Sequence, residues 1–158
     1  MKRAKKYSVM AIISLALVFV FMGVAAGFNS NWGSIKITDI YYPNSDGTMI
    51  HAQLFVPAGT SSADPAPAIL NMHGGSDYLQ MVGNYSIELA RRGYVVLSVD
   101  AYGSGESDYV SGVASNAGGS GGENTALKMD GGVSTGIEQL LTYDFVDQDN
   151  IGMIGHSM

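Results

Sequence analysis

The sequence contains no cysteine among its 158 residues. Without thiols the chain cannot form disulfides, bind zinc through thiolates or use a cysteine nucleophile. Charged residues are also scarce, at 14%, whereas hydrophobic residues make up 46%. This balance excludes a disordered or coiled-coil chain and favours one folded domain of ordinary size. The missing cysteines do not assign a compartment, because many exported proteins also lack them.

Basic residues are nearly absent after the first few positions. Four of the eight lie within the first six residues, and the others are Lys36, Arg91, Arg92 and Lys128. From Asn29 onward these four stand against all fourteen acidic residues, a formal charge of −10. A body this acidic repels phosphate backbones, and it shows no basic patch with interleaved aromatic residues. We therefore expect no nucleic-acid partner.

A long apolar run follows the N-terminal basic cluster. Residues 9–28 contain Ser14 as their only strongly polar side chain, and a helix of this length spans roughly 30 Å, about one hydrocarbon thickness. We expect a membrane anchor at 9–28, with residues 1–8 in the cytoplasm and residues 29–158 outside it. A cleaved signal peptide is the alternative, with a small-residue site at Val24-Ala25-Ala26 and a secreted product. A buried core helix is the third interpretation.

Short strands, turns and helices follow the leader. Apolar alternation and β-branched runs predict strands near residues 35–40, 49–56, 68–72, 94–99 and 151–154. Helices are expected at 86–92 and 129–143, and the Gly/Ser-rich stretch 111–122 is expected to be a loop. The turn at 44–47 joins the first two strands into a hairpin. The alternation of strands and helices after it predicts an α/β fold with a mostly parallel sheet.

Three polar, glycine-rich segments follow predicted strands, where parallel sheets collect their chemistry. They are His73-Gly74-Gly75, the segment 100–108 and Gly155-His156-Ser157. A serine between a buried strand and a helix occupies a strained turn that exposes its hydroxyl, and such a turn needs small residues two positions away on either side. Gly155 meets this requirement upstream. By itself G-x-S is a weak signal, and the His-Gly-Gly segment could equally be an ordinary turn with an exposed histidine.

Together these segments resemble the first half of an α/β hydrolase of the serine-aminopeptidase, lipase or dienelactone-hydrolase-like kind. The resemblance covers residues 35–158 and rests on three motifs, which are N-M-H-G-G at 71–75, G-Y-V-V-L-S-V-D-A-Y-G-S-G-E-S at 93–107 and D-N-I-G-M-I-G-H-S-M at 149–158. It implies the N-terminal half of an α/β-hydrolase fold, with Ser157 as the nucleophile and the N–H groups of Gly75 and Met158 as oxyanion donors. Asp100 is expected to order its loop rather than to serve as the triad acid.

The resemblance leaves the catalytic triad incomplete. In this fold the acid and the histidine follow the serine along the chain, and Ser157 is the penultimate residue here. The histidines present are His51 in the hairpin, His73 in the oxyanion turn and His156 inside the elbow, and none is placed to act as the base. We expect an incomplete record of a longer protein that is inactive as it stands, with the strand before Ser157 left as an apolar open edge.

Other candidate sites have weaker signatures. Gly103-Ser104-Gly105 lacks the third glycine of a dinucleotide loop, and the glycines of 118–122 are not followed by Lys-Ser/Thr. Asp147, Asp149 and Gly152 resemble a calcium loop, but position twelve would be Met158 rather than glutamate. We therefore expect no metal and no cofactor. Trp32, Tyr41 and Tyr42 could be interfacial anchors or ordinary packing residues.

Two function classes remain open. The first is an exported serine hydrolase that acts on an ester, thioester or small peptide amide through an acyl-enzyme. The second is a membrane-tethered, non-catalytic binding module on the same scaffold. The partners expected are a small-molecule or peptide substrate and, through residues 9–28, a membrane.

Overall fold

The computed structural model describes residues 2–75, 77–108 and 130–157. These residues belong to two compact units, Met1–Ser34 and Ile35–Met158. The loop predicted at 111–122 and the proposed oxyanion residue Met158 lie outside the described residues, as does the start of the helix predicted from Met129.

The first unit is a single long helix, α1 (Lys2–Asn29). Its stretch Tyr7–Asn29 has a mean hydropathy of 2.7 and is not buried by other parts of the protein, so it is long and apolar enough for a membrane span or a signal sequence. The helix ends in a turn where Asn31 and Trp32 adopt positive φ values of 49° and 57°. The Trp32 N–H donates to the Gly27 carbonyl at 2.6 Å, and its ring packs against Phe28 with centroids 5.7 Å apart.

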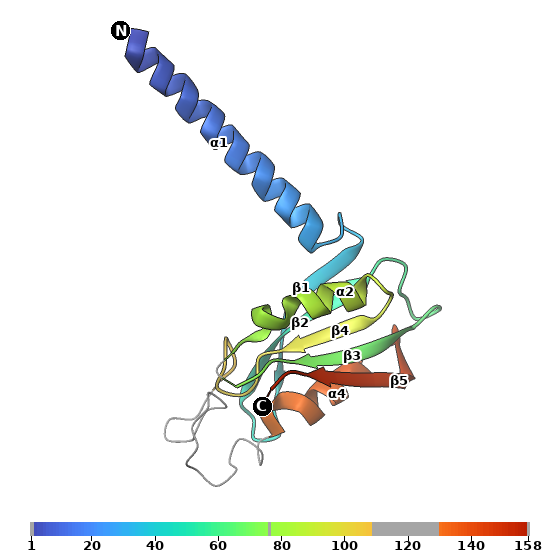
Figure 1. Cartoon of the computed structure of the whole chain (residues 1–158). Helices are drawn as coiled ribbons and strands as arrows, with labels where there is room; N and C mark the ends of the chain where they lie inside the picture. The colour runs from blue at the N-terminus through green and yellow to red at the C-terminus, as the bar shows by residue number, and fades with distance from the viewer. Residues whose placement is uncertain (1, 76, 109–129, 158) are drawn as a thin grey trace. The chain divides into compact units, whose positions relative to one another are not determined.

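The second unit is built on a five-stranded sheet in the order β1-β2-β4-β3-β5 (Figure 1). The strands are β1 (Ile35–Pro43), β2 (Met49–Pro57), β3 (Ala66–Met72), β4 (Val95–Val99) and β5 (Val146–Gly155). β2 pairs antiparallel with β1 and with β4, whereas β3 runs parallel to both β4 and β5. The hairpin followed by parallel strands is the arrangement predicted from the sequence.

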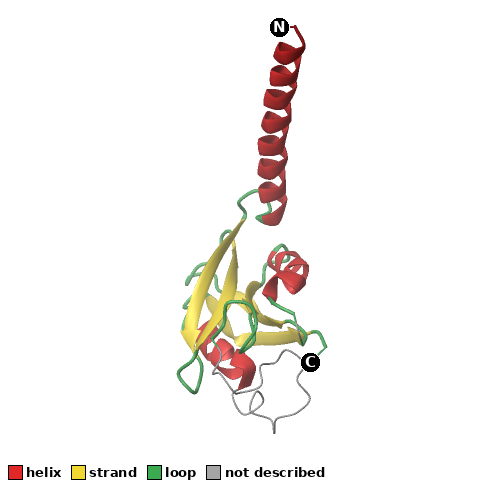
Figure 2. Ribbon diagram, turned by 90° about the vertical axis from the view of Figure 1, so that its left-hand side faces the viewer, coloured by secondary structure: helices red, strands yellow, loops and turns green. Residues whose placement is uncertain are grey.

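Two helices cover opposite faces of this sheet (Figure 2). On one face α4 (Val133–Leu141) packs on the main core, which contains Leu140 together with Leu70 and Leu97. On the other face α2 (Gly83–Ala90) packs on a smaller core around Phe55 and Val96. Neighbouring residues of β4 therefore serve different cores, because side chains alternate across a strand. Two short 3-10 helices, η1 (Leu79–Val82) and η2 (Asp130–Gly132), precede α2 and α4.

The structure corrects two local predictions. The last helix begins at Val133, because Gly131 and Gly132 adopt φ values of 54° and 93° that a continuous helix does not accept. The strand before Ser157 is longer than predicted and mostly exposed rather than buried, with Met153 58% accessible. It is the terminal strand of the described sheet and pairs with β3, which agrees with the open edge expected for it.

Candidate active site

The three glycine-rich segments converge at one edge of the sheet, as their positions after parallel strands predict. Met72 at the end of β3 lies beside Val99 of β4 and Gly155 of β5. His73, Asp100 and His156 therefore leave the sheet side by side, and Ser157 follows His156.

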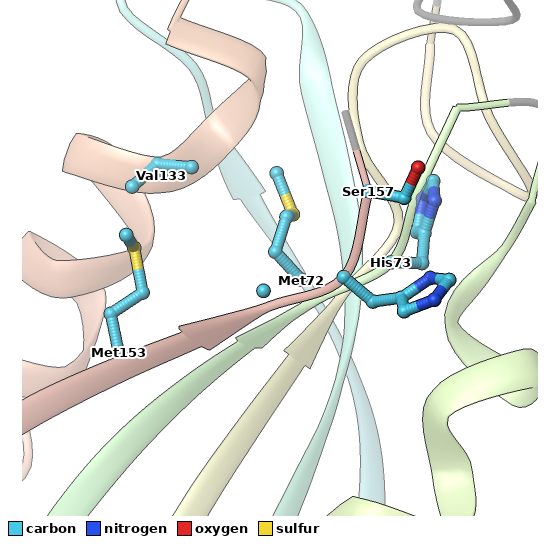
Figure 3. A pocket seen from close by; sticks show the side chains of 7 residues that line it. Met72, His73, Val133, Met153 and Ser157 are labelled. Atoms are coloured by element: carbon cyan, nitrogen blue, oxygen red, sulfur yellow. The ribbon is translucent and has the colours of Figure 1, made fainter.

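Ser157 occupies a strained backbone conformation at the tip of its strand. Its φ is 39°, in the left-handed region that non-glycine residues rarely adopt. The preceding residue is tied to β3, because the His156 N–H donates to the Met72 carbonyl at 3.2 Å. Ser157 is exposed, and Figure 3 shows its hydroxyl directed away from Val133 and Met153. Strain of this kind persists where the surrounding structure holds it, and it concentrates at functional sites.

The glycine that the described turn crowds is not the one in the motif. A Cβ at Gly155 would lie 3.9 Å from the Met72 Cβ, which is an ordinary contact among the described residues. The tight position is Gly74, where a Cβ would lie 2.5 Å from the Ser157 carbonyl oxygen and 2.8 Å from that of His156. Both contacts are to backbone, which cannot swing away as a side chain can. The signal for this was the doubled glycine after His73.

Gly75 and Ser157 are brought together, with the Gly75 N–H donating to the Ser157 carbonyl oxygen at 2.9 Å. Residues some eighty positions apart in the chain are therefore direct neighbours. The amide expected to point at an oxyanion is engaged by the main chain of Ser157 in this conformation. The second expected donor, Met158, lies outside the described residues.

His73 is buried and both of its ring nitrogens are occupied. Nδ1 lies 2.7 Å from the Gly74 carbonyl oxygen, and Nε2 accepts the Ala101 N–H at 2.9 Å. The ring must therefore carry its hydrogen on Nδ1, since Nε2 acts as an acceptor. The alternative of an exposed histidine in an ordinary turn is wrong, because His73 is 1% accessible. Instead its ring links the loop after β3 to the loop after β4.

Asp100 is wholly buried at the end of β4 and accepts several hydrogen bonds. Oδ1 accepts the Leu79 N–H at 2.7 Å, and Oδ2 accepts the Glu106 N–H at 3.1 Å. His51 Nδ1 lies 2.8 Å from the same Oδ2. These bonds hold the 100–108 loop against the segment that follows Gly75. His51 was assigned no role from the sequence, although a histidine in an apolar strand was a usable signal.

The charged groups around this loop perturb one another at its surface. The Tyr41 hydroxyl donates to Glu106 Oε2 at 2.7 Å. The hydrogen bond to the Glu106 carboxylate raises the pKa of Tyr41, helped by burial and by the negative charges of Glu106, Asp39 and Asp100. Among the described residues, no group of three or more His, Asp or Glu side chains is arranged to hold a metal ion.

A pocket of about 270 Å³ lies beside Ser157, between α4 and β5 (Figure 3). Its apolar wall is formed by Met72, Val133 and Met153, and its other lining residues are His73, Gly155, His156 and Ser157. Because the Ser157 hydroxyl is directed away from Val133 and Met153, this pocket lies behind the serine and not in front of its reacting group.

The chain is similar in sequence and in structure to known proteins. The family model described as X-Pro dipeptidyl-peptidase (S15 family) matches residues 46–157. No curated protein sequence matches the chain. Among solved structures, a hypothetical protein from Pseudomonas aeruginosa is similar with a TM-score of 0.64 and 24% identity, covering 77% of this chain and 35% of its own.

Two further structures carry the same fold. An acetyl xylan esterase from Paenibacillus sp. R4 has a TM-score of 0.63 at 21% identity, over 86% of this chain and 50% of the esterase. The α/β hydrolase GrgF from Penicillium sp. sh18 has a TM-score of 0.58 at 15% identity, over 76% of this chain and 37% of its own. The likeness confirms the α/β-hydrolase fold predicted from the sequence. The chain spans between 35% and 50% of the length of these three structures.

Proposed function

The chain belongs to the X-Pro dipeptidyl-peptidase family S15, and on that premise we propose that it carries the nucleophile of a serine hydrolase. The reaction proposed is cleavage of an ester, thioester or peptide amide through an acyl-enzyme. Ser157 attacks the substrate carbonyl, a base removes the hydroxyl proton, and the leaving group departs with that proton.

The observation that carries this proposal is the backbone of Ser157. A serine held in a left-handed conformation at a strand tip, exposed and braced by Gly74, has the features of a nucleophile elbow. A serine with a purely structural role would relax into an ordinary extended or helical conformation, because the left-handed region costs roughly 1–2 kcal/mol per residue.

The oxyanion site proposed consists of the Gly75 and Met158 N–H groups. Developing negative charge in acyl transfer needs donors about 3 Å from the oxyanion. Gly75 already lies at the elbow, and it can serve once its N–H exchanges the Ser157 carbonyl for the substrate oxygen. We expect substrate binding to bring about that exchange.

The general base is not one of the two buried histidines. Both ring nitrogens of His73 are engaged, and those of His51 face Asp100 and Asp39. His156 lies within the elbow itself. The order of the triad in this fold places the acid and the histidine after the serine. We therefore expect the base in the part of the family's length that this chain does not span.

The substrate class is proposed from two directions. The family description points to peptide amides that follow an X-Pro pair, whereas one structural relative is an acetyl xylan esterase. A panel of an X-Pro anilide and an acetylated sugar, assayed with the full open reading frame, separates amide from ester preference. If the protein hydrolyses neither the X-Pro anilide nor the acetylated sugar, both proposed substrate classes are contradicted.

The central test is labelling with a fluorophosphonate probe, which reacts with activated serines. The full-length protein should be labelled, and Ser157→Ala should abolish the labelling, because the attacking oxygen is removed. Ser61→Ala, at an exposed serine of the β2–β3 connection, is the matched control and should label like the wild type. Labelling that survives in Ser157→Ala would contradict the assignment of the nucleophile.

A non-catalytic binding module is the second candidate. The observation in its favour is that the Gly75 N–H is occupied by Ser157, so the oxyanion site is closed in this conformation. A well-folded full-length protein that is never labelled would support the module over the enzyme.

We also propose that α1 anchors the protein in a membrane, with the hydrolase domain outside the cytoplasm. The support is the length of the apolar stretch Tyr7–Asn29 together with the basic residues that precede it. A secreted form after signal cleavage is the alternative. Mass spectrometry of the mature N-terminus tests this, and a chain that begins near Gly27 would contradict the anchor.

A further inference from the structure

His51 is a buried histidine that the proposed reaction does not use. It lies on β2, is 1% accessible, and faces a carboxylate at each ring nitrogen. Nδ1 lies 2.8 Å from Asp100 Oδ2, and Nε2 lies 3.3 Å from Asp39 Oδ1. Tyr41 of β1 covers the ring, with centroids 5.0 Å apart. Carboxylate oxygens only accept hydrogen bonds, so both contacts are satisfied only when the ring carries a hydrogen on each nitrogen.

Asp100 has the His51 ring within ion-pair distance, at 2.8 Å. The Asp100 side chain is wholly buried, and in residues 2–75, 77–108 and 130–157 its ion-pair partner is the His51 ring. A buried carboxylate without a cationic partner is strongly disfavoured. The space for this carboxylate is reserved by Gly105, whose φ is +53° and where a Cβ would overlap the Asp100 carboxyl group.

A continuous path of contacts connects this pair to the serine. Asp100 Oδ1 accepts the Leu79 N–H, which fixes the far end of the segment that begins at Gly75. The next residue, Ala101, donates its N–H to His73, and His73 donates to the Gly74 carbonyl. Gly74 abuts the Ser157 carbonyl so closely that no side chain fits between them. Both ends of the loop that carries Gly75 are thus tied to residues 100 and 101.

We propose that His51, doubly protonated, is a positioning residue that ties the β1–β2 hairpin to Asp100 and thereby places the Gly75 loop against Ser157. The inference deepens the proposed hydrolase function and rests on it. His51 touches neither the serine nor the oxyanion donors. It acts by holding the Asp100 carboxyl group in place, so that the amides of Leu79 and Glu106 have their acceptor.

The test compares two variants in the full open reading frame. His51→Gln removes the ring, and because the glutamine amide lies nearest the position of Nε2, the contact from Nδ1 to Asp100 is lost. Tyr42→Phe is the control, because it removes a buried hydroxyl that donates to the Gly132 carbonyl at 2.9 Å on the opposite face of the same hairpin. Both are expected to lower the melting temperature, so stability alone does not separate them.

The separating readout is the hydrolysis of p-nitrophenyl acetate, resolved into kcat and KM. For His51→Gln we expect kcat to fall on the order of tenfold to a hundredfold with KM unchanged, since small displacements of a reacting group cost this much. Tyr42→Phe should keep both constants. A His51→Gln variant with wild-type kcat, or an equal loss of kcat in Tyr42→Phe, would overturn the proposal.

A second measurement needs no variant. In protein carrying ¹⁵N-labelled histidine, the His51 ring should show two protonated nitrogens, whereas His73 should show hydrogen on Nδ1 alone. An unprotonated His51 nitrogen would overturn the proposal even if His51→Gln does not fold. A wild-type protein that hydrolyses no ester and takes no fluorophosphonate would instead contradict the proposed function, while the ring signals would still report the tie between His51 and Asp100.

Discussion

Strands β4 and β5 lead to the two halves of the candidate site, yet they are held in opposite ways. Every residue of β4 is buried, whereas β5 is mostly exposed along its length. β4 pairs with β2 and β3 and is covered by helices on both faces. β5 pairs with β3, and the outward side chain of Met153 is largely accessible.

The loops that follow the two strands differ in the same sense. The loop after β4 is held by the buried Asp100 carboxylate, by His73 and by the Ser107 hydroxyl, which donates to the Asp100 carbonyl at 2.7 Å. The turn after β5 is held by its main-chain bonds to Met72 and Gly75. The difference teaches that buried side chains hold the loop after β4, whereas main-chain hydrogen bonds hold the turn that carries Ser157.

The largest effect should come from emptying the core at β4. Leu97 is wholly buried, and Leu97→Ala should lower the free energy of unfolding by about 3 kcal/mol through lost burial and a cavity. Met153→Ala on β5 should change it by less than about 0.5 kcal/mol, as expected of an exposed position. Urea denaturation measures both. A Met153→Ala variant as unstable as Leu97→Ala would mean that β5 is covered in the protein and would break the comparison.

A smaller effect should follow from adding one methyl group at matched glycines. Gly105→Ala forces a non-glycine residue to a φ of +53° against the Asp100 carboxylate, and we expect a loss of about 2 kcal/mol. At Gly152 of β5 a Cβ would meet nothing within 4 Å, so Gly152→Ala should be neutral or slightly stabilising. Thermal unfolding distinguishes them. Equal melting temperatures for the two variants would show that the Asp100 loop shifts easily to accept a side chain at position 105.

The smallest effect should come from the surface ion pairs of α2, the exposed counterpart of the buried His51–Asp100 pair. Arg92 and Arg91 contact the Glu88 carboxylate at 2.7 Å and 2.6 Å, and their hydrogen bonds and charges lower the pKa of Glu88 below its ordinary 4.5. A lowered folded-state pKa stabilises the fold above the ordinary value, and this contribution is lost as the pH falls through the folded pKa.

Glu88→Gln should therefore lower the melting temperature slightly at neutral pH and leave it unchanged in strong acid, where Glu88 is protonated in both states. Melting curves at several pH values, repeated in high salt, measure this, because salt screens exposed pairs. A difference between the proteins that persists below the folded pKa would show that Glu88 acts through packing rather than charge.

Local patterns predicted most of the secondary structure. The β-branched run 94–99 predicted a strand, and β4 occupies residues 95–99 with every residue buried. The turn residues at 44–47 predicted the hairpin, whose register pairs Pro43 with Met49. The predicted ends of helices were less accurate than their existence. The helix expected from Met129 begins at Val133, because two consecutive glycines adopt positive φ.

The sequence by itself determined the apolar leader, the order of strands and helices, and the glycine-rich segments that follow three of the strands. These depend on side-chain periodicity and on the steric freedom of glycine, which are properties of short segments. The tertiary structure alone decided which glycine is tight against Ser157, that the Gly75 amide meets the Ser157 carbonyl, and that His51 serves Asp100. Such contacts join residues some fifty to eighty positions apart. Only the pairing of strands side by side in the sheet brings those residues within hydrogen-bonding distance.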